Sequence, residues 1–145
     1  MKNIDLTPFP SLCFDPRRMK MFKMANSNRL KKAKNIGMKL IQENPFDLGT
    51  LIYLSMCLGK LEGNTENKYY LRMKAIVQSI LYTGDGNTSE SSIKISNIGD
   101  DGLLVGFLGF NGKRIEDSNI DGKMFSLWES SSGRKLYFEY VFIFL

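Results

Sequence analysis

Apolar residues recur at every third or fourth position through the first half of the chain, which is the spacing of one buried face of an α-helix. Asp15 and Pro16 fit a helix start, because Asp accepts hydrogen bonds from free amides and proline suits the first turn. The expected helices are residues 15–44 with an interruption at 26–28, then 47–63 and 65–83.

After residue 84 the apolar positions alternate with polar ones, which is typical of half-buried β-strands. Four dipeptides of turn type separate the runs: Asp101-Gly102, Asn111-Gly112, Asp121-Gly122 and Ser132-Gly133. The expected strands of this β-meander are residues 92–98, 103–110, a short one near 114, 123–128 and 135–144. The last is apolar on both faces, so it should lie in the centre of a sheet.

Together these elements predict an α+β fold, in which N-terminal helices of a tetratricopeptide-like hairpin pack on a C-terminal antiparallel sheet of four to five strands. A length of 145 residues is typical of one domain. We expect a single domain over residues 1–145, with a flexible lead-in at 1–14, a helical part at 15–83 and a β part at 84–145.

The composition removes several kinds of catalytic site. The chain has no histidine, which excludes histidine-based serine or cysteine triads and imidazole metal ligands. Cys13 and Cys57 match neither a paired-thiol motif nor a zinc site, so no disulfide, metal or cofactor is expected. No apolar run approaches the roughly 20 residues of a membrane-spanning helix. The start of the chain lacks the pattern of an export signal.

Charge is distributed unevenly. Residues 1–44 carry 10 basic and 3 acidic residues, a net charge of +7, whereas residues 45–145 carry 10 and 12, a net charge of −2. The basic side chains of the first helical stretch are Arg17, Arg18, Lys20, Lys23, Arg29, Lys31, Lys32 and Lys34. They indicate either a solvated helix face, which is the more frequent cause, or attachment to nucleic acid or anionic lipid.

A polar loop follows the third predicted helix. Its candidate ligand-binding residues are Asp85, Asn87, Thr88 and Ser89. Its glycines would let backbone amides approach an anion, although it lacks the lysine of a nucleotide-binding loop. The loop is also explained as a glycine helix stop and a turn into the first strand. The turn acids Asp100 and Asp101 are explained by hairpin chemistry in the same way.

The second and third predicted helices carry apolar and small residues at repeat-like positions: Leu51, Leu54, Ser55, Leu58 and Leu71, with Pro45 just before them. This pattern resembles the helix pair of tetratricopeptide repeats, although Asn67, Lys74 and Ser79 depart from it. One pair cannot bury its own faces, so the sheet should act as its neighbour. Three aromatic residues, Tyr69, Tyr70 and Trp128, are candidates for a partner-binding surface or for the core.

A more specific resemblance runs along the chain from about residue 40 to 144. It is carried by the stretches at residues 45–48, 80–88, 93–96, 100–101 and 136–138. Their succession resembles a family of uncharacterised bacterial proteins with a domain of unknown function. The resemblance implies no catalytic residue, and it implies exported relatives with more sequence upstream. Residues 1 to about 30 depart from the family pattern, which would leave an apolar groove open to self-association.

The helix pair and the lack of catalytic equipment favour a non-enzymatic protein-interaction or scaffold module, although the sequence does not decide whether the protein is an enzyme. One alternative is an anion- or carbohydrate-binding or hydrolytic domain that uses the 84–91 loop. Another is attachment of the basic helix to nucleic acid or anionic lipid, of which nucleic acid is the less favoured partner. The compartment stays open.

Overall fold

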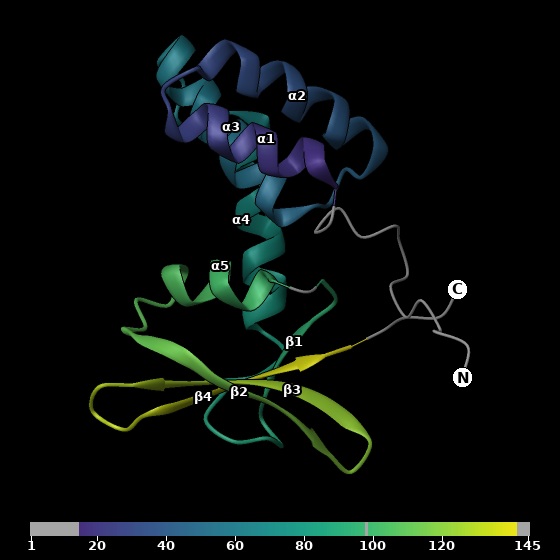
Figure 1. The fold of residues 1–145 in the computed structure, drawn as a ribbon, viewed down its shortest axis with the longest axis vertical. Helices are drawn as coiled ribbons and strands as arrows, with labels where there is room; N and C mark the ends of the chain where they lie inside the picture. The colour runs from purple at the N-terminus through teal and green to yellow at the C-terminus, as the bar shows by residue number, and fades with distance from the viewer. Residues whose placement is uncertain (1–14, 98, 142–145) are drawn as a thin grey trace. The chain divides into compact units, whose positions relative to one another are not determined.

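The computed structural model describes residues 15–97 and 99–141 of the chain (Figure 1). Helices come first and a sheet follows, so the predicted α+β class is confirmed. The described chain forms two compact units, a helical unit of residues 15–77 and a sheet unit that begins at Gln78. That the whole chain is a single domain stays a prediction. The predicted lead-in at 1–14 lies outside the described residues.

The helical unit contains α1 (Pro16–Asn26), α2 (Leu30–Glu43), α3 (Leu48–Glu62) and the start of α4 (Lys68–Leu81). The predicted interruption at residues 26–28 separates α1 from α2, and Asn28 adopts a left-handed conformation there with φ 61°. Helix α2 packs on both α1 and α3. The core of this unit is formed by Met21, Ala25, Ala33, Leu40 and Cys57.

An ion pair inside the helical unit fixes the start of α3. Asp47 is the N-cap of α3, and its Oδ2 accepts hydrogen bonds from the backbone N of Thr50 at 2.9 Å and from the hydroxyl of Thr50 at 2.6 Å. The same oxygen lies 3.3 Å from Nε of Arg18, whose side chain is buried. Arg18 therefore belongs to the interior and not to the basic surface that the sequence suggested.

Replacing Asp47 with alanine should lower the free energy of unfolding by roughly 3 kcal/mol, because the helix loses its cap and the buried Arg18 loses its counter-ion. Asp47→Asn retains a capping oxygen and should cost less. Urea denaturation followed by circular dichroism measures both. Equal and small losses for the two variants would contradict the proposed role of the ion pair.

The sheet unit contains β1 (Ile93–Ile95), α5 (Asp100–Phe107), β2 (Gly112–Ile120), β3 (Lys123–Ser130) and β4 (Lys135–Tyr140). The strand order is β1-β4-β3-β2, so β4 is central, as its two apolar faces predicted. The pairs β2–β3 and β3–β4 are antiparallel, but β1 pairs with β4 in parallel. The sheet is therefore mixed and not purely antiparallel. The chain passes through α5 and the β2–β3 hairpin before it returns beside β1 in the same direction.

The strand predicted at 103–110 is wrong, because this segment lies mostly within helix α5. Gly99, with φ 96°, precedes the helix, and Asp100 and Asp101 occupy its first turn, where negative charge is favourable. Asp101-Gly102 is thus part of a helix and not a hairpin turn. A short apolar run such as residues 103–105 has the same pattern in a strand and in a buried helix.

Two of the other predicted turns of the sheet unit lie between strands, as expected. Asp121 and Gly122 form a two-residue loop between β2 and β3, with φ values of 53° and 79°. Gly133 has φ 84° in the turn between β3 and β4. Asn111-Gly112 leads into β2, which is a nine-residue strand and not the short one expected near 114. No helix in the described part of the chain is long and apolar enough to cross a membrane.

Candidate functional site

Strand β2 forms one edge of the sheet and is open to solvent along its length. Of its nine residues only Ser118 is half-buried, and the others are exposed. Within the described chain, its one strand neighbour is β3. A free edge of this kind presents unpaired backbone N–H and C=O groups to another extended chain.

The tight turn at Asp121-Gly122 decides which backbone groups of β2 face outward. In a two-residue hairpin the flanking residues, here Ile120 and Lys123, form a hydrogen-bonded pair. Alternation along the strand then directs the N–H and C=O groups of Asp117 and Asn119 away from β3. These groups are the available hydrogen-bonding positions on the C-terminal half of the edge.

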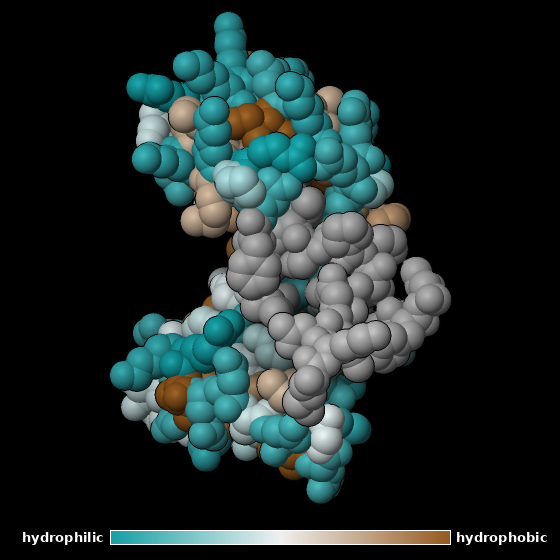
Figure 2. Space-filling view, turned by 45° about the vertical axis from the view of Figure 1, so that its right-hand side comes forward, coloured by the Kyte–Doolittle hydropathy of each residue, from teal (hydrophilic) through white to brown (hydrophobic). Residues whose placement is uncertain are grey.

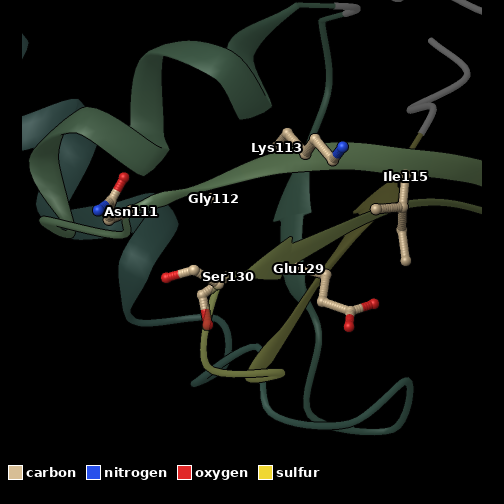
Figure 3. Close-up of a pocket in the computed structure, with 7 residues that line it drawn as sticks. Asn111, Gly112, Lys113, Ile115, Glu129 and Ser130 are labelled. Carbon is tan, nitrogen blue, oxygen red and sulfur yellow. The ribbon is translucent and has the colours of Figure 1, made fainter.

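A cleft of about 560 Å³ lies at the N-terminal end of the same strand. Figure 3 shows Lys113 and Ile115 from β2 and Glu129 and Ser130 from β3 around it. The full lining is Asn111, Gly112, Lys113, Ile115, Glu129, Ser130 and Ser131. It offers an ammonium group, a carboxylate, hydroxyl and amide groups and one apolar side chain, which suits a mixed polar and apolar ligand such as a peptide side chain.

Gly112 allows β2 to pack closely against β3 beside this cleft. A Cβ atom at this position would lie 2.5 Å from the carbonyl oxygen of Glu129 and 2.6 Å from Cε1 of Phe110. Both contacts are too short for any side chain. The absence of a side chain at Gly112 therefore permits the close approach of β2 to β3 beside the cleft.

The buried carboxylate of Asp101 in α5 anchors β2 through Arg114, on the face of the sheet opposite to Lys113. Oδ2 of Asp101 in α5 accepts hydrogen bonds from Oγ of Ser126 at 2.6 Å and from Nε1 of Trp128 at 2.9 Å, both on β3. It also accepts two bonds from the guanidinium of Arg114 on β2, at 3.0 Å from Nε and 2.5 Å from Nη2. Its other oxygen, Oδ1, is buried without a hydrogen-bond partner in the described residues. Asp101 thus ties one helix to two strands.

These contacts also set the protonation of the site. Burial alone would raise the pKa of Asp101, but hydrogen bonds from Ser126, Trp128 and Arg114 outweigh it and hold the pKa below its ordinary value of 3.8. The pKa of Tyr140 on β4 is raised, first by burial and then by the nearby charge of Asp101. The carboxylate is therefore ionised at neutral pH inside the sheet unit.

The loop predicted to bind a ligand is closed by its own hydrogen bonds. Oδ1 of Asp85 accepts from the backbone N of Asn87 at 2.9 Å and from Oγ of Ser91 at 2.7 Å. The hydroxyl of Thr88 lies 2.9 Å from that of Ser91. The bond from the Asn87 amide, followed by that from Ser91, lowers the pKa of Asp85. This geometry is that of a turn, and ligand binding by Asp85, Asn87, Thr88 and Ser89 stays a prediction.

The three aromatic candidates occupy different surroundings. Tyr69 is buried in the helical unit, and its hydroxyl donates to Sδ of Met38 at 3.2 Å. Tyr70 is half-buried, and Trp128 of the sheet unit donates its indole N–H to Asp101. Their role in binding a partner stays a prediction. Among the described residues, no group of three or more Cys, Asp or Glu side chains could hold a metal ion.

Comparison with known protein families gives a match that covers most of the chain. Residues 16–128, which run from the first helix to Trp128 of β3, match the family described as "Domain of unknown function (DUF4919)". The chain belongs to this family. The match confirms the resemblance to an uncharacterised family, and it begins at residue 16 and not near residue 40. It also includes residues 16–30, which had been expected to depart from the family pattern.

The DUF4919 match covers α5 and the whole of β2, so the anchored edge strand lies within the family domain. The description of the family assigns no activity, and the function of the chain is therefore unknown, as expected. No curated protein and no solved structure matches the chain significantly.

We expect Asp101→Asn to lower the free energy of unfolding at pH 7 by roughly 2 kcal/mol, because Arg114 loses its counter-ion and a buried acceptor is replaced. Since the folded pKa of Asp101 is depressed, its stabilisation is fully present above 3.8 and is lost as the pH falls through the lower folded pKa. The stability difference between the wild type and Asp101→Asn should therefore shrink in acid.

Urea denaturation at a series of pH values measures this difference. Glu90→Gln, which removes an exposed acid from the same unit, is the matched control and should change stability little. A stability difference for Asp101→Asn that stays constant, or grows, as the pH falls below 3.8 would contradict the assignment.

Proposed function

We propose that this chain is a non-enzymatic protein-interaction module that takes an extended segment of a partner onto the free edge of β2. The observation that supports this proposal is the nine-residue edge strand, exposed along its length and anchored by Arg114 to the buried Asp101. Strand addition gains affinity from backbone hydrogen bonds and specificity from pockets beside the edge. A rigid edge also loses little conformational freedom when the partner binds.

The cleft at Lys113, Ile115 and Glu129 supplies the pocket for such specificity. It lies beside the edge, so a segment on β2 would direct a side chain into it. The visible face of the molecule is mainly hydrophilic with small hydrophobic patches (Figure 2). Strand β2 itself is exposed and carries Lys113, Arg114, Glu116 and Asp117, so backbone hydrogen bonds and charge suit this edge better as the source of binding energy than one large apolar contact does.

A second candidate surface lies on the tetratricopeptide-like pair α3 and α4. A cleft of about 370 Å³ in the helical unit is lined by Ser55, Met56, Gly59, Lys60, Thr65 and Tyr70. It favours a helix or loop of a protein partner as the occupant, with the half-buried Tyr70 as a contact. This surface is less favoured because it lacks a row of unpaired backbone groups.

The basic helices provide weaker support for attachment to nucleic acid or anionic lipid. Arg18 is buried against Asp47, Arg17 is bound by Asp15 and Glu43, and Lys34 by Glu62. The five other members of the basic set that the sequence indicated are all exposed: Lys20, Lys23, Arg29, Lys31 and Lys32. Their spread over two helices and a turn is also that of a solvated face.

Selection from a random peptide display library tests strand addition. Asp117→Pro removes an outward N–H and places a proline ring on the edge, while the inward ladder to β3 keeps its donors. Selected peptides should bind this variant about tenfold or more weakly than the wild type. Isothermal titration calorimetry with synthetic peptides measures the loss.

Asp117→Asn is the matched control, because it removes the charge but keeps the backbone N–H, and it should bind the peptides nearly as the wild type does. Circular dichroism verifies that both variants are folded. Peptides that bind Asp117→Pro as tightly as the wild type would contradict the proposal.

A further inference from the structure

A row of charged side chains crosses the sheet and ends at its free edge. Lys135 on β4 is opposite Glu129 on β3, and Glu129 is opposite Lys113 on β2. Residues directly opposite in neighbouring strands share a face, so these three side chains lie on one face and alternate in sign. Lys113 is exposed and ends the row within the described chain. On a strand added to the edge, the next place in this row favours an acid.

Glu116 lies on the same face of the sheet. It is opposite Leu127, and Leu127 and Glu129 share a face because they are alternate residues of β3. None of the ion pairs in the described part of the chain involves Glu116. By the alternation that starts at the Asp121-Gly122 turn, the backbone groups of Glu116 point toward β3. A residue opposite Glu116 on an added strand would therefore form a non-hydrogen-bonded pair, in which side chains come closest. This place favours a cation.

A β-bulge sets the spacing of these two charges. Lys113 and Glu116 are three residues apart in sequence, which in a regular strand would place them on opposite faces. The register with β3 shifts between Arg114 and Glu116, so Ile115 is an extra residue and the two charges share a face. Their opposite residues on β3 are only two positions apart. A regular strand that follows the free edge as β3 follows the inner side would meet the two charges at positions i and i+2.

We infer that the partner segment which β2 accepts runs antiparallel to it and carries a basic residue followed two positions later by an acidic one, Lys/Arg-x-Asp/Glu. This inference rests on the proposed function, because it states the chemistry of the partner for the same edge. An antiparallel segment meets Glu116 first and Lys113 second, so its cation precedes its acid. Antiparallel pairing is also how β2 joins β3, and it is slightly more stable per residue than parallel pairing.

The same charges select against other segments. Charged side chains on an edge oppose pairing with strands that do not match them. A segment with the complementary order turns both charges into attractive cross-strand pairs. Its acid would lie at the cleft, where Lys113 supplies the ammonium group.

Selection from one random peptide display library on two proteins tests the inference. The proteins are the wild type and the exchange variant, Lys113→Glu with Glu116→Lys, which leaves the donors to Asp101 in place. Peptides selected on the wild type should be enriched in Lys/Arg-x-Asp/Glu, and peptides selected on the exchange variant in Asp/Glu-x-Lys/Arg.

Isothermal titration calorimetry at low salt then compares a peptide selected on the wild type with a copy in which its cation and acid are exchanged, since added salt screens exposed charges. The copy should bind the wild type roughly tenfold more weakly, because two attractive cross-strand pairs become repulsive. The exchange variant should reverse this preference and bind the copy more tightly.

Thermal melts verify that both proteins are folded. If Asp117→Pro weakens the selected peptides but they show no charge order, or the reverse order, the inference is overturned and the proposed function is retained. If no peptide is selected, or none is weakened by Asp117→Pro, both are removed. Sedimentation velocity of the wild type without peptide detects self-association, and a dimer that Asp117→Pro dissociates would place a second copy on the edge and overturn the inference.

Discussion

Asp101 brings a negative charge into the interior of the sheet unit, where an ion is costly unless it is bonded on several sides. Four hydrogen bonds from Arg114, Ser126 and Trp128 to a single oxygen meet that cost and join α5, β2 and β3. Because one of these donors comes from β2, the edge strand is fixed from within although its outer side is open. The candidate binding edge therefore depends on a residue that is itself fully buried.

This arrangement separates support from recognition. One face of β2 directs Arg114 toward Asp101, and the other directs Lys113 toward the cleft. Lys113 and Arg114 are consecutive in the register with β3, so the ordinary alternation of a strand places them on opposite faces. The anchor and the cleft therefore lie on opposite faces of the same strand.

The sequence predicted the fold class, the separation of α1 from α2 and the central position of β4, because periodicity and apolar content report burial directly. It did not predict α5, since a short apolar run is compatible with either element and Asp101-Gly102 resembles a hairpin turn. The parallel partner of β1 was also missed, because alternation along a strand carries no information about which strand lies beside it.

The Asp101 cluster and the open edge were missed for related reasons. Arg114, Ser126 and Trp128 meet Asp101 only through the register of β2 and β3, which single-sequence patterns do not contain. A signal for the edge was present, since the run Lys113-Arg114-Ile115-Glu116-Asp117 is too charged for a central strand. The prediction for this segment was a short strand near 114. The charges of the run are the signal that would have identified the strand as an edge.

The position of β4 has a consequence for synthesis on the ribosome. β4 is the last strand of the described sheet in sequence and lies between β1 and β3, so β1 has no partner strand until β4 has been synthesised. The helical unit, whose contacts are closer in sequence, has what it needs to fold first. Before β4 is made, Ile93 and Ile95, which are buried in the folded structure, lack the residues of β4 that lie beside them. Apolar surface that is exposed during synthesis favours aggregation, and it is the kind of surface that chaperones cover.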